Sequence, residues 1–271
     1  MTKIILVGCG NMGFAMLQRW MAHDEKPDVL VVEPAEALRT RAGQAGARTI
    51  ADQADLPAGW QADVVMLATK PALVLEVIGH YAAAMHSGSV VVSVAAGIAA
   101  SAIAERLGAG AAVIRCMPNT PAAIGEGMMV CCPNADVTRD QRQLVQRLLE
   151  GNGKVAFVDD EAMMDAVTAV SGSGPAYVFH FIECLAAAGE KAGLPADLSL
   201  MLARQTALGA ARLASESNDP PAELRRQVTS PNGTTAAALD VLMRADDGLM
   251  DLLKEAVTAA KDRSVALGKP S

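Results

Sequence analysis

A turn that leads into a helix is the stretch of this chain best suited to bind an anion. It comprises residues 230–235, Ser-Pro-Asn-Gly-Thr-Thr, and Ala- and Leu-rich sequence follows. Proline, asparagine and glycine favour a turn, and the residues from Thr234 onward favour a helix. The first backbone N–H groups of a helix lack partners within it and carry the positive end of the helix dipole, so they can bind a phosphate or a carboxylate. The alternative is ordinary N-capping by a threonine hydroxyl.

A glycine-rich loop near the start of the chain has the spacing of a dinucleotide-binding site. Residues 3–7 predict a buried parallel strand, and an apparent helix runs from Phe14 to Ala22. Between them lie Gly8, Cys9, Gly10, Asn11, Met12 and Gly13. In this motif the first glycine permits a tight turn, the second lets a pyrophosphate approach the backbone, and the third lets the helix pack closely on the strand. The alternative is a glycine-rich turn without a function.

Glu33 is the candidate residue for the adenosine ribose of a dinucleotide. It follows the predicted strand at 29–32 and stands 20 residues after Gly13, where such sites place an acid on the ribose hydroxyls. A carboxylate there would repel a 2′-phosphate. Arg39 and Arg41 could counter that repulsion, or they could lie on a solvated helix face. Glu33 therefore favours NADH, but the choice between NADPH and NADH stays open.

Three further segments follow predicted strands and are candidates for the same cofactor site. Strands are predicted over 63–68, 90–94 and 112–116, and final strands over 128–132 and 154–158. Helices are predicted from residue 71 to about 85 and from 138 to 150. Ligands bind at the carboxyl ends of the strands in an open α/β sheet. The candidates are Ala68, Thr69, Lys70 and Pro71, then Ala95, Ala96 and Gly97, and finally Asn119. For residues 95–97, simple close packing is an equal alternative.

After Asp159 the pattern changes to helices alone. They are predicted at about 160–170, 175–192, 196–217, 221–228, 234–245 and 247–267. This order predicts an α/β Rossmann-type dinucleotide-binding domain over residues 1–159, followed by an all-α substrate-binding and dimerisation domain over 160–271. Long apolar helices such as Met201 to Leu213 carry more Ala and Leu than one small bundle needs, so we expect a homodimer or a higher homo-oligomer.

The composition argues against several classes of function. The net charge of -7 disfavours a nucleic-acid partner. No apolar run approaches the length of a membrane span, and the sequence begins in a strand without a signal peptide. The five irregularly spaced cysteines and four scattered histidines predict reduced thiols in the cytoplasm, with neither a disulfide framework nor a metal site.

Five motifs in order along the chain resemble those of the pyrroline-5-carboxylate reductase family. They are the glycine loop at 8–13, Ala-Thr-Lys-Pro at 68–71, Met-Pro-Asn-Thr-Pro at 117–121, Ser-Gly-Ser-Gly-Pro-Ala-Tyr at 171–177, and Val-Thr-Ser-Pro-Asn-Gly-Thr-Thr at 228–235. The resemblance covers essentially the whole chain. It implies reduction of 1-pyrroline-5-carboxylate to L-proline by NADPH or NADH, and binding of the substrate carboxylate by the turn at 230–235. Asn232 replaces a glycine of the family pattern, and Glu33 replaces a small polar residue.

The resemblance and the chemistry of the substrate together indicate the substrate site. A protonated cyclic imine is already an electrophile, so catalysis would consist mostly of positioning and would need no strong acid on the protein. Thr235 is the expected catalytic residue, because its hydroxyl could orient the ring nitrogen. The expected substrate-binding residues are Glu161, Ser173, Tyr177, Gly233, Thr234 and Thr235.

Two other functions stay open from the sequence. A β-hydroxyacid-type dehydrogenase has a similar two-domain plan, but it places a lysine on the helix after a similar glycine-rich segment. Residues 175–183 contain no lysine. A non-catalytic NAD(P)-binding sensor is the second alternative, and the intact motifs at 171–177 and 228–235 argue against it.

Overall fold

The chain forms two compact units. The structure is a computed structural model that describes residues 1–268. Of the described residues, the first unit contains 1–172 and 260–268, and the second contains Ser173–Ala259. The first unit therefore extends beyond the boundary expected after Asp159. The reason is that Met164 packs in a small core with Met117 and Val130 of the sheet.

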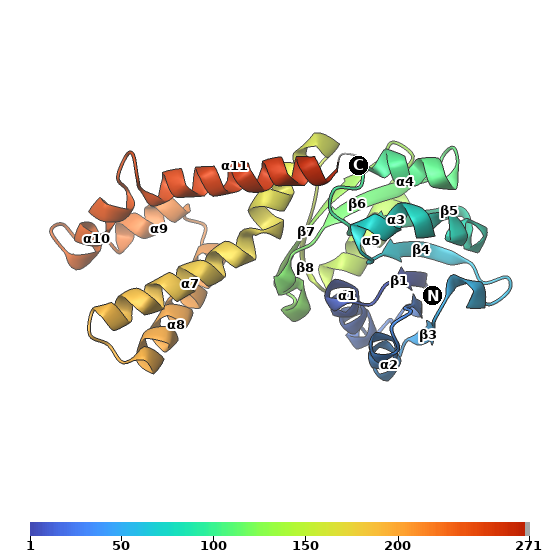
Figure 1. Cartoon of the computed structure of the whole chain (residues 1–271), viewed down its shortest axis with the longest axis horizontal. Helices are drawn as coiled ribbons and strands as arrows, with labels where there is room; N and C mark the ends of the chain where they lie inside the picture. The colour runs from blue at the N-terminus through green and yellow to red at the C-terminus, as the bar shows by residue number, and fades with distance from the viewer. Residues whose placement is uncertain (269–271) are drawn as a thin grey trace. The chain divides into compact units, whose positions relative to one another are not determined.

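The first unit contains an eight-stranded sheet, with strand order β3-β2-β1-β4-β5-β6-β7-β8. The strands are β1 (Lys3–Val7), β2 (Asp28–Val32), β3 (Arg48–Ile50), β4 (Ala62–Leu67), β5 (Met85–Ser93), β6 (Val113–Met117), β7 (Gly127–Pro133) and β8 (Gly153–Phe157). Strands β1 to β6 are parallel, β7 is antiparallel to β6, and β8 is parallel to β7 (Figure 1). The first six strands have the order of a Rossmann dinucleotide-binding sheet, which confirms the expected fold class.

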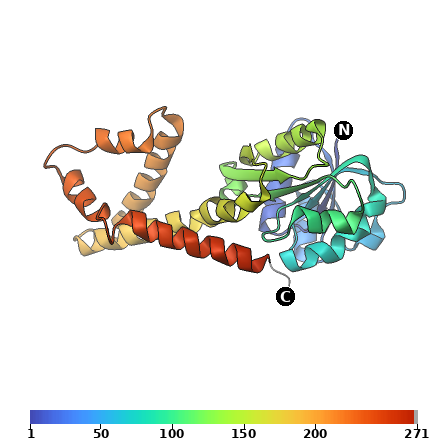
Figure 2. The ribbon, with the colours of Figure 1, turned by 90° about the horizontal axis from the view of Figure 1, so that it is seen from above.

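Helices cover both faces of this sheet (Figure 2). Helices α1 (Asn11–Ala22), α2 (Glu36–Gln44) and α5 (Arg139–Glu150) pack on one face, where Ile4 and Leu6 of β1 are buried. Helix α3 (Pro71–Val77), the 3-10 helix η2 (Ile78–Ala84) and α4 (Ala100–Leu107) pack on the other face with Ile5 and Val7. Because successive side chains of a strand point to opposite faces, a continuous apolar run is required for a sheet buried on both sides.

The helical part begins with short, irregular pieces. The helix expected over 160–170 is divided into the 3-10 turn η4 (Glu161–Met163), α6 (Met164–Val167) and the π-helical segment η5 (Thr168–Gly172). The second unit contains α7 (Gly174–Lys191), α8 (Ala196–Glu216), α9 (Pro221–Gln227), α10 (Thr234–Leu242) and most of α11 (Leu249–Leu267). A Cβ atom at Gly189 of α7 would lie 3.0 Å from Oγ of Ser199, so α7 and α8 are closely packed. Among residues 1–268, no helix has the length and apolar character needed to span a membrane.

Candidate functional site

The three glycines of the loop after β1 have different steric environments. Gly8 has φ of +85°, and a Cβ atom there would lie 2.8 Å from the carbonyl oxygen of Ala68. A Cβ atom at Gly13 would lie 2.5 Å from the carbonyl oxygen of Gly8. These two positions therefore exclude a side chain for reasons of folding. A Cβ atom at Gly10 would meet nothing within 4 Å, so packing does not explain this glycine, and the open space in front of it leaves room for a ligand.

The start of α1 has the properties of an anion site. Gly10 is the N-cap and supplies no side-chain hydrogen bond, and the first turn contains no acidic residue. The helical hydrogen bonds begin with the N–H of Phe14, which donates to the carbonyl of Gly10 at 2.9 Å. The preceding N–H groups of the helix are thus left for a ligand. A hollow of about 370 Å³ lies beside them and is lined by Asn11, Met12, Phe14, Ala15, Gln18, Arg41, Thr120 and Ala123.

Glu33 is buried directly beneath the glycine loop, with 6% of its surface exposed. One carboxylate oxygen accepts from the N–H of Cys9 at 2.8 Å, and the other accepts from the N–H of Ala35 at 2.9 Å. Glu33, which follows the last residue of β2, therefore also fixes Cys9, the second residue of the glycine loop. Because each carboxylate oxygen can accept further hydrogen bonds, these contacts leave capacity for ribose hydroxyls.

The two arginines of α2 bind backbone carbonyls of this region. Arg39 donates to the carbonyls of Glu33 and Pro34, both at 2.9 Å. Arg41 donates to the carbonyl of Cys9 at 2.9 Å, and its guanidinium lies 4.0 Å from the centre of the Phe14 ring. The solvated helix face considered from the sequence is therefore wrong for Arg41, which holds the loop in place.

The Cys9 side chain contributes packing and no nucleophile. It is fully buried, and this burial raises the pKa of its thiol to about 11, although Arg41 opposes the shift. The thiol is therefore protonated at neutral pH. The N–H of Cys9 donates to Glu33 and its carbonyl accepts from Arg41, so this residue contributes to a cofactor site by fixing the backbone of the loop.

The residues after β4 lie next to the glycine loop. The N–H of Ala68 donates to the carbonyl of Val7 at 2.8 Å, and the Ala68 side chain faces Gly13. Thr69 is half-buried, whereas Lys70 and Pro71 are exposed at the start of α3. The Ala-Thr-Lys-Pro motif thus places its small residue against the loop and its charged residue in solvent.

The segments after β5 and β6 have structural partners of their own. A Cβ atom at Gly97 would lie 3.3 Å from the backbone nitrogen of Gly268, so close packing accounts for this glycine. The Asn119 amide oxygen accepts from the N–H of Met128 at 2.8 Å, and its amide nitrogen donates to the carbonyl of Ser171 at 3.2 Å. Asn119 therefore joins β7 to the segment before α7.

Glu161 is committed to contacts within the first unit. One of its carboxylate oxygens accepts from Nη1 of Arg115 at 2.7 Å and from the N–H of Ala100 at 2.8 Å. Arg115 is buried, with 8% of its surface exposed, whereas 35% of the Glu161 side chain is exposed. This carboxylate thus connects β6 to the first residue of α4.

The turn before α10 is closed by a hydrogen bond at 3.0 Å from the N–H of Gly233 to the carbonyl of Ser230. Asn232 has φ of 58°, a left-handed conformation that asparagine tolerates better than most residues. The N-cap of α10 is Gly233, which gives no side-chain hydrogen bond. The N-capping alternative for the two threonines is therefore wrong. Thr234 is exposed and Thr235 is half-buried in the first turn.

The start of α7 differs from that of α10, because it follows the π-helical segment η5 directly. Ser173 is the N-cap without a side-chain hydrogen bond, and Pro175 occupies the first turn. A Cβ atom at Gly174 would meet nothing within 4 Å. Tyr177 is half-buried one turn later. Pro175 has no N–H group and the N–H of Ala176 donates to the carbonyl of Ser173 at 3.0 Å, so this helix start offers a ligand fewer backbone donors than that of α10.

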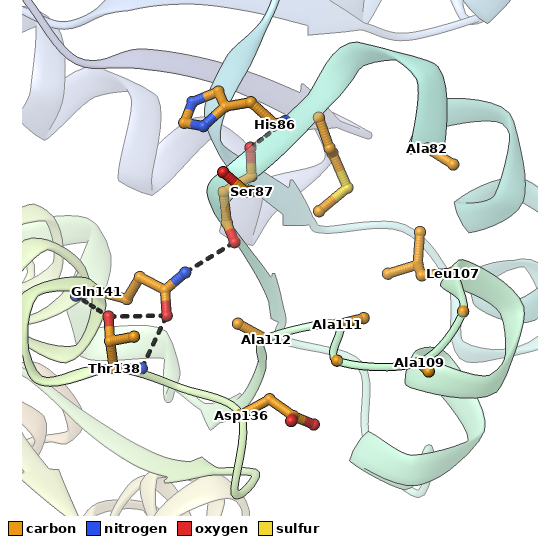
Figure 3. Close-up of a pocket in the computed structure, with 14 residues that line it drawn as sticks. Ala82, His86, Ser87, Leu107, Ala109, Ala111, Ala112, Asp136, Thr138 and Gln141 are labelled. Atoms are coloured by element: carbon orange, nitrogen blue, oxygen red, sulfur yellow. Dashed lines mark hydrogen bonds between the residues drawn. The ribbon is translucent and has the colours of Figure 1, made fainter.

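A hollow of about 200 Å³ lies at the opposite edge of the sheet, near the starts of β5 and β6. It contains the Thr138 and Gln141 pair that caps α5, and Gln141 donates to the carbonyls of Gly88 and Ser89 (Figure 3). Its polar groups stabilise the local fold, and it lies away from the carboxyl edge that carries the glycine loop. Across residues 1–268, no group of three or more His, Cys, Asp or Glu side chains is arranged to hold a metal ion.

The expected residues gather in two sets. The structure brings the glycine loop, Glu33 and residues 68–71 together at the carboxyl edge of the sheet. Ser173, Tyr177 and residues 233–235 belong to two helix starts of the second unit. Two residues with structural roles were missed by sequence reasoning. They are Arg115 and Ser264, and no local pattern identifies their partners.

Comparison with known proteins assigns the family. The family model described as pyrroline-5-carboxylate reductase dimerisation matches residues 161–267, and that of NADP oxidoreductase, coenzyme F420-dependent, matches residues 3–97. Pyrroline-5-carboxylate reductase of Pseudomonas aeruginosa is 39% identical over 98% of this chain and 97% of its own. The Escherichia coli enzyme of that name is 35% identical, with 98% of each chain covered.

Solved structures agree with this assignment. The structure of a pyrroline-5-carboxylate reductase from Coxiella burnetii superposes with a TM-score of 0.92 at 33% identity, covering 99% of both chains. The Plasmodium falciparum pyrroline carboxylate reductase, solved with NADP bound, gives a TM-score of 0.84 at 28% identity, covering 99% of this chain and 98% of its own. The chain belongs to the pyrroline-5-carboxylate reductase family.

Proposed function

We propose that this protein reduces 1-pyrroline-5-carboxylate to L-proline with NADPH or NADH, the last step of proline biosynthesis. The observation that carries this proposal is the start of α10. It has a glycine N-cap without a side-chain hydrogen bond, directly after a closed Ser-Pro-Asn-Gly turn, in a chain that belongs to the reductase family. A β-hydroxyacid dehydrogenase and a non-catalytic sensor would leave this substrate motif unexplained.

The cofactor would be bound by the first unit. The open space at Gly10 and the uncapped start of α1 suit a pyrophosphate. Glu33 would meet the adenosine ribose, and the residues after β4, β5 and β6 would face the nicotinamide half. These comprise Ala68, Thr69, Lys70, Pro71, Ala95, Ala96, Gly97 and Asn119. When bound, the reduced nicotinamide supplies the hydride.

The substrate would be held by the helix starts of the second unit. The N–H groups of Thr234 and Thr235, the first two residues of α10, would bind its carboxylate, because the first N–H groups of a helix have no partner within it. The Gly233 N–H closes the preceding turn by donating to the carbonyl of Ser230 and so shapes this site from behind. The Thr235 hydroxyl would orient the ring nitrogen, and Ser173 and Tyr177 would line the same pocket. A protonated imine needs orientation more than it needs an acid, so a neutral hydroxyl is sufficient for this task.

The experiment that tests the proposal is a comparison of Thr235→Ala with Thr234→Ala. Neither threonine is the N-cap, so neither change should cost the roughly 1 kcal/mol that loss of a cap costs. Loss of a hydrogen bond made in the transition state should lower kcat/KM about ten- to a thousandfold in Thr235→Ala. Thr235→Ser, which retains a hydroxyl, should recover most of that loss. Normal turnover of pyrroline-5-carboxylate by Thr235→Ala would remove this residue from the mechanism.

We also infer a homodimer or a higher homo-oligomer. The support is the match of residues 161–267 to a dimerisation family and the exposed apolar side chains of α7, α8 and α11. These include Val178, Phe179, Phe181, Leu185, Leu202, Leu208, Leu213, Leu252 and Leu253. An exposed apolar area of this kind is typical of an interface between subunits. Sedimentation analysis should therefore give a mass of at least twice 28.0 kDa.

We place the enzyme in the cytoplasm. All five cysteines are free thiols, and four of them are buried. This pattern is typical of a reducing compartment, which would also supply the reduced nicotinamide. Fractionation of cells that produce the protein would test the location.

A further inference from the structure

The loop between β5 and α4 carries the proposed nicotinamide segment, residues 95–97, and leads directly into α4. Helix α4 has no capping side chain of its own, because its N-cap residue is Ala99. The N–H of Ala100, the first helical residue, instead donates to the carboxylate of Glu161, 61 positions later in the sequence. The Glu161 carboxylate therefore caps the N-terminus of α4 and fixes the end of the loop at Ala100.

Arg115 holds Glu161 in this position. Its Nη1 lies 2.7 Å from the same carboxylate oxygen that binds Ala100, and the arginine is almost fully buried. A buried arginine without a carboxylate partner would be strongly unfavourable, so the pair constrains both residues. The charge and the hydrogen bond together specify one place for the Glu161 carboxylate.

The middle of the loop is held by the end of the chain. A Cβ atom at Gly97 would lie 3.3 Å from the carbonyl carbon of Leu267, the last residue of α11, and one at Gly268 would lie 2.9 Å from the carbonyl oxygen of Gly97, so the end of α11 contacts this peptide directly. This end of the helix is anchored by Ser264, which is buried and donates to the carboxylate of Asp165 at 2.6 Å. Glu161 and Asp165, four residues apart, therefore support the loop at Ala100 and, through α11, at Gly97.

We propose that Glu161 is a positioning residue for the cofactor side of the site, acting through the N–H of Ala100 on residues 95–99. This inference rests on the proposed function, in which residues 95–97 face the nicotinamide. It replaces the substrate-binding role expected for Glu161 from the sequence. A positioning role affects cofactor affinity and turnover, whereas a substrate contact affects the KM for the imine.

The test measures the Kd for NADPH and NADH by nicotinamide fluorescence, and the KM for pyrroline-5-carboxylate at saturating cofactor. Glu161→Ala should raise the cofactor Kd about tenfold or more, the effect of losing a hydrogen bond to a charged group. The KM for the imine should stay within about twofold of wild type. Glu161→Gln keeps an oxygen for the Ala100 N–H and should recover part of the cofactor affinity. Asp159→Asn is the matched control, because 92% of the Asp159 side chain is exposed. Its ion pair with Arg142 is long, with 3.9 Å between Oδ1 and Nη1.

A higher KM for the imine with unchanged cofactor Kd would overturn the proposal and place Glu161 against the substrate. Ser264→Ala gives a second, independent test, since it loosens α11 at Gly97 without touching Glu161. It should also weaken cofactor binding and leave the KM for the imine unchanged. If Glu161→Ala does not fold, normal cofactor affinity in both Glu161→Gln and Ser264→Ala would refute the inference. A wild-type protein that binds NADPH or NADH but does not reduce the imine would refute the proposed function instead.

Discussion

Replacement of Glu33 by glutamine should shift the cofactor preference of this enzyme toward NADPH. The carboxylate is buried at the end of β2 and bound to the N–H groups of Cys9 and Ala35. It would therefore present a fixed negative charge to the adenosine ribose. Glutamine has nearly the same shape and removes that charge, so the change alters electrostatics more than packing.

The size of the shift follows from the lost repulsion. A unit charge about 5 Å from a 2′-phosphate contributes about 1–3 kcal/mol at an effective dielectric constant between 80 and 20. This corresponds to a change of roughly five- to a hundredfold in relative affinity. Glutamine can accept only one of the two backbone N–H bonds, so the loop should also lose about 1–3 kcal/mol of stabilisation. That loss affects both cofactors equally.

The assay is the ratio of kcat/KM for NADPH to kcat/KM for NADH, in which damage common to both cofactors cancels. Glu36→Gln is the matched control, because Glu36 is an exposed acid in the first turn of α2 and has the same charge. Its ratio should equal that of the wild type. A ratio in Glu33→Gln that also equals the wild-type value, with kcat/KM lowered equally for both cofactors, would refute the assignment of Glu33 to the ribose.

Three further results are expected. Gly10→Ala should have the melting temperature of the wild type, but its Kd for NADPH and NADH should be about tenfold higher or more. Gly13→Ala should also lose about 1–3 kcal/mol of stability, because the new Cβ atom would lie 2.5 Å from a backbone oxygen. Burial raises the pKa of the Cys9 thiol from 9.0 to about 11, so the unfolded chain loses this proton first as pH rises. The free energy of unfolding should therefore fall by about 2 kcal/mol at pH 10.5. Urea unfolding of Cys9→Ala should lack this contribution to the pH dependence. Asn232→Gly should retain kcat/KM within about threefold, but Asn232→Val should cost about 1–2 kcal/mol at φ of 58°, which thermal unfolding would detect.

The features predictable from the sequence are those that neighbouring residues determine. The apolar run of β1 can only be buried on both faces, and the structure has a strand over the expected residues 3–7. The turn at 230–233 requires a residue that tolerates positive φ, and Asn232 provides it. Gly8 and Gly13 exclude a side chain because of contacts within one strand-turn-helix unit and the adjacent strand.

Elements without local signals were missed or misjudged. The edge strand β3 has three residues, too few for a hydrophobic period to be recognised. Helix α4 has no Ser, Thr, Asp or Asn at its N-cap, and no sequence rule would supply Glu161 in its place. The helix expected from Pro71 to about Met85 tightens to 3-10 geometry at Ile78, so α3 is shorter than its apolar pattern indicates.

The same distinction separates the two kinds of candidate site residue. The geometry of a glycine or a helix start depends on its own backbone, and the structure has the expected turns before α1 and α10. The function of a charged side chain depends on which partner the fold brings within hydrogen-bonding distance of it. Arg41 binds the loop carbonyl of Cys9, 32 positions earlier, and Glu161 binds Arg115, 46 positions earlier. Sequence spacing gives no information about such pairs, so a carboxylate expected at the substrate instead binds the first residue of α4, next to the segment proposed to face the cofactor.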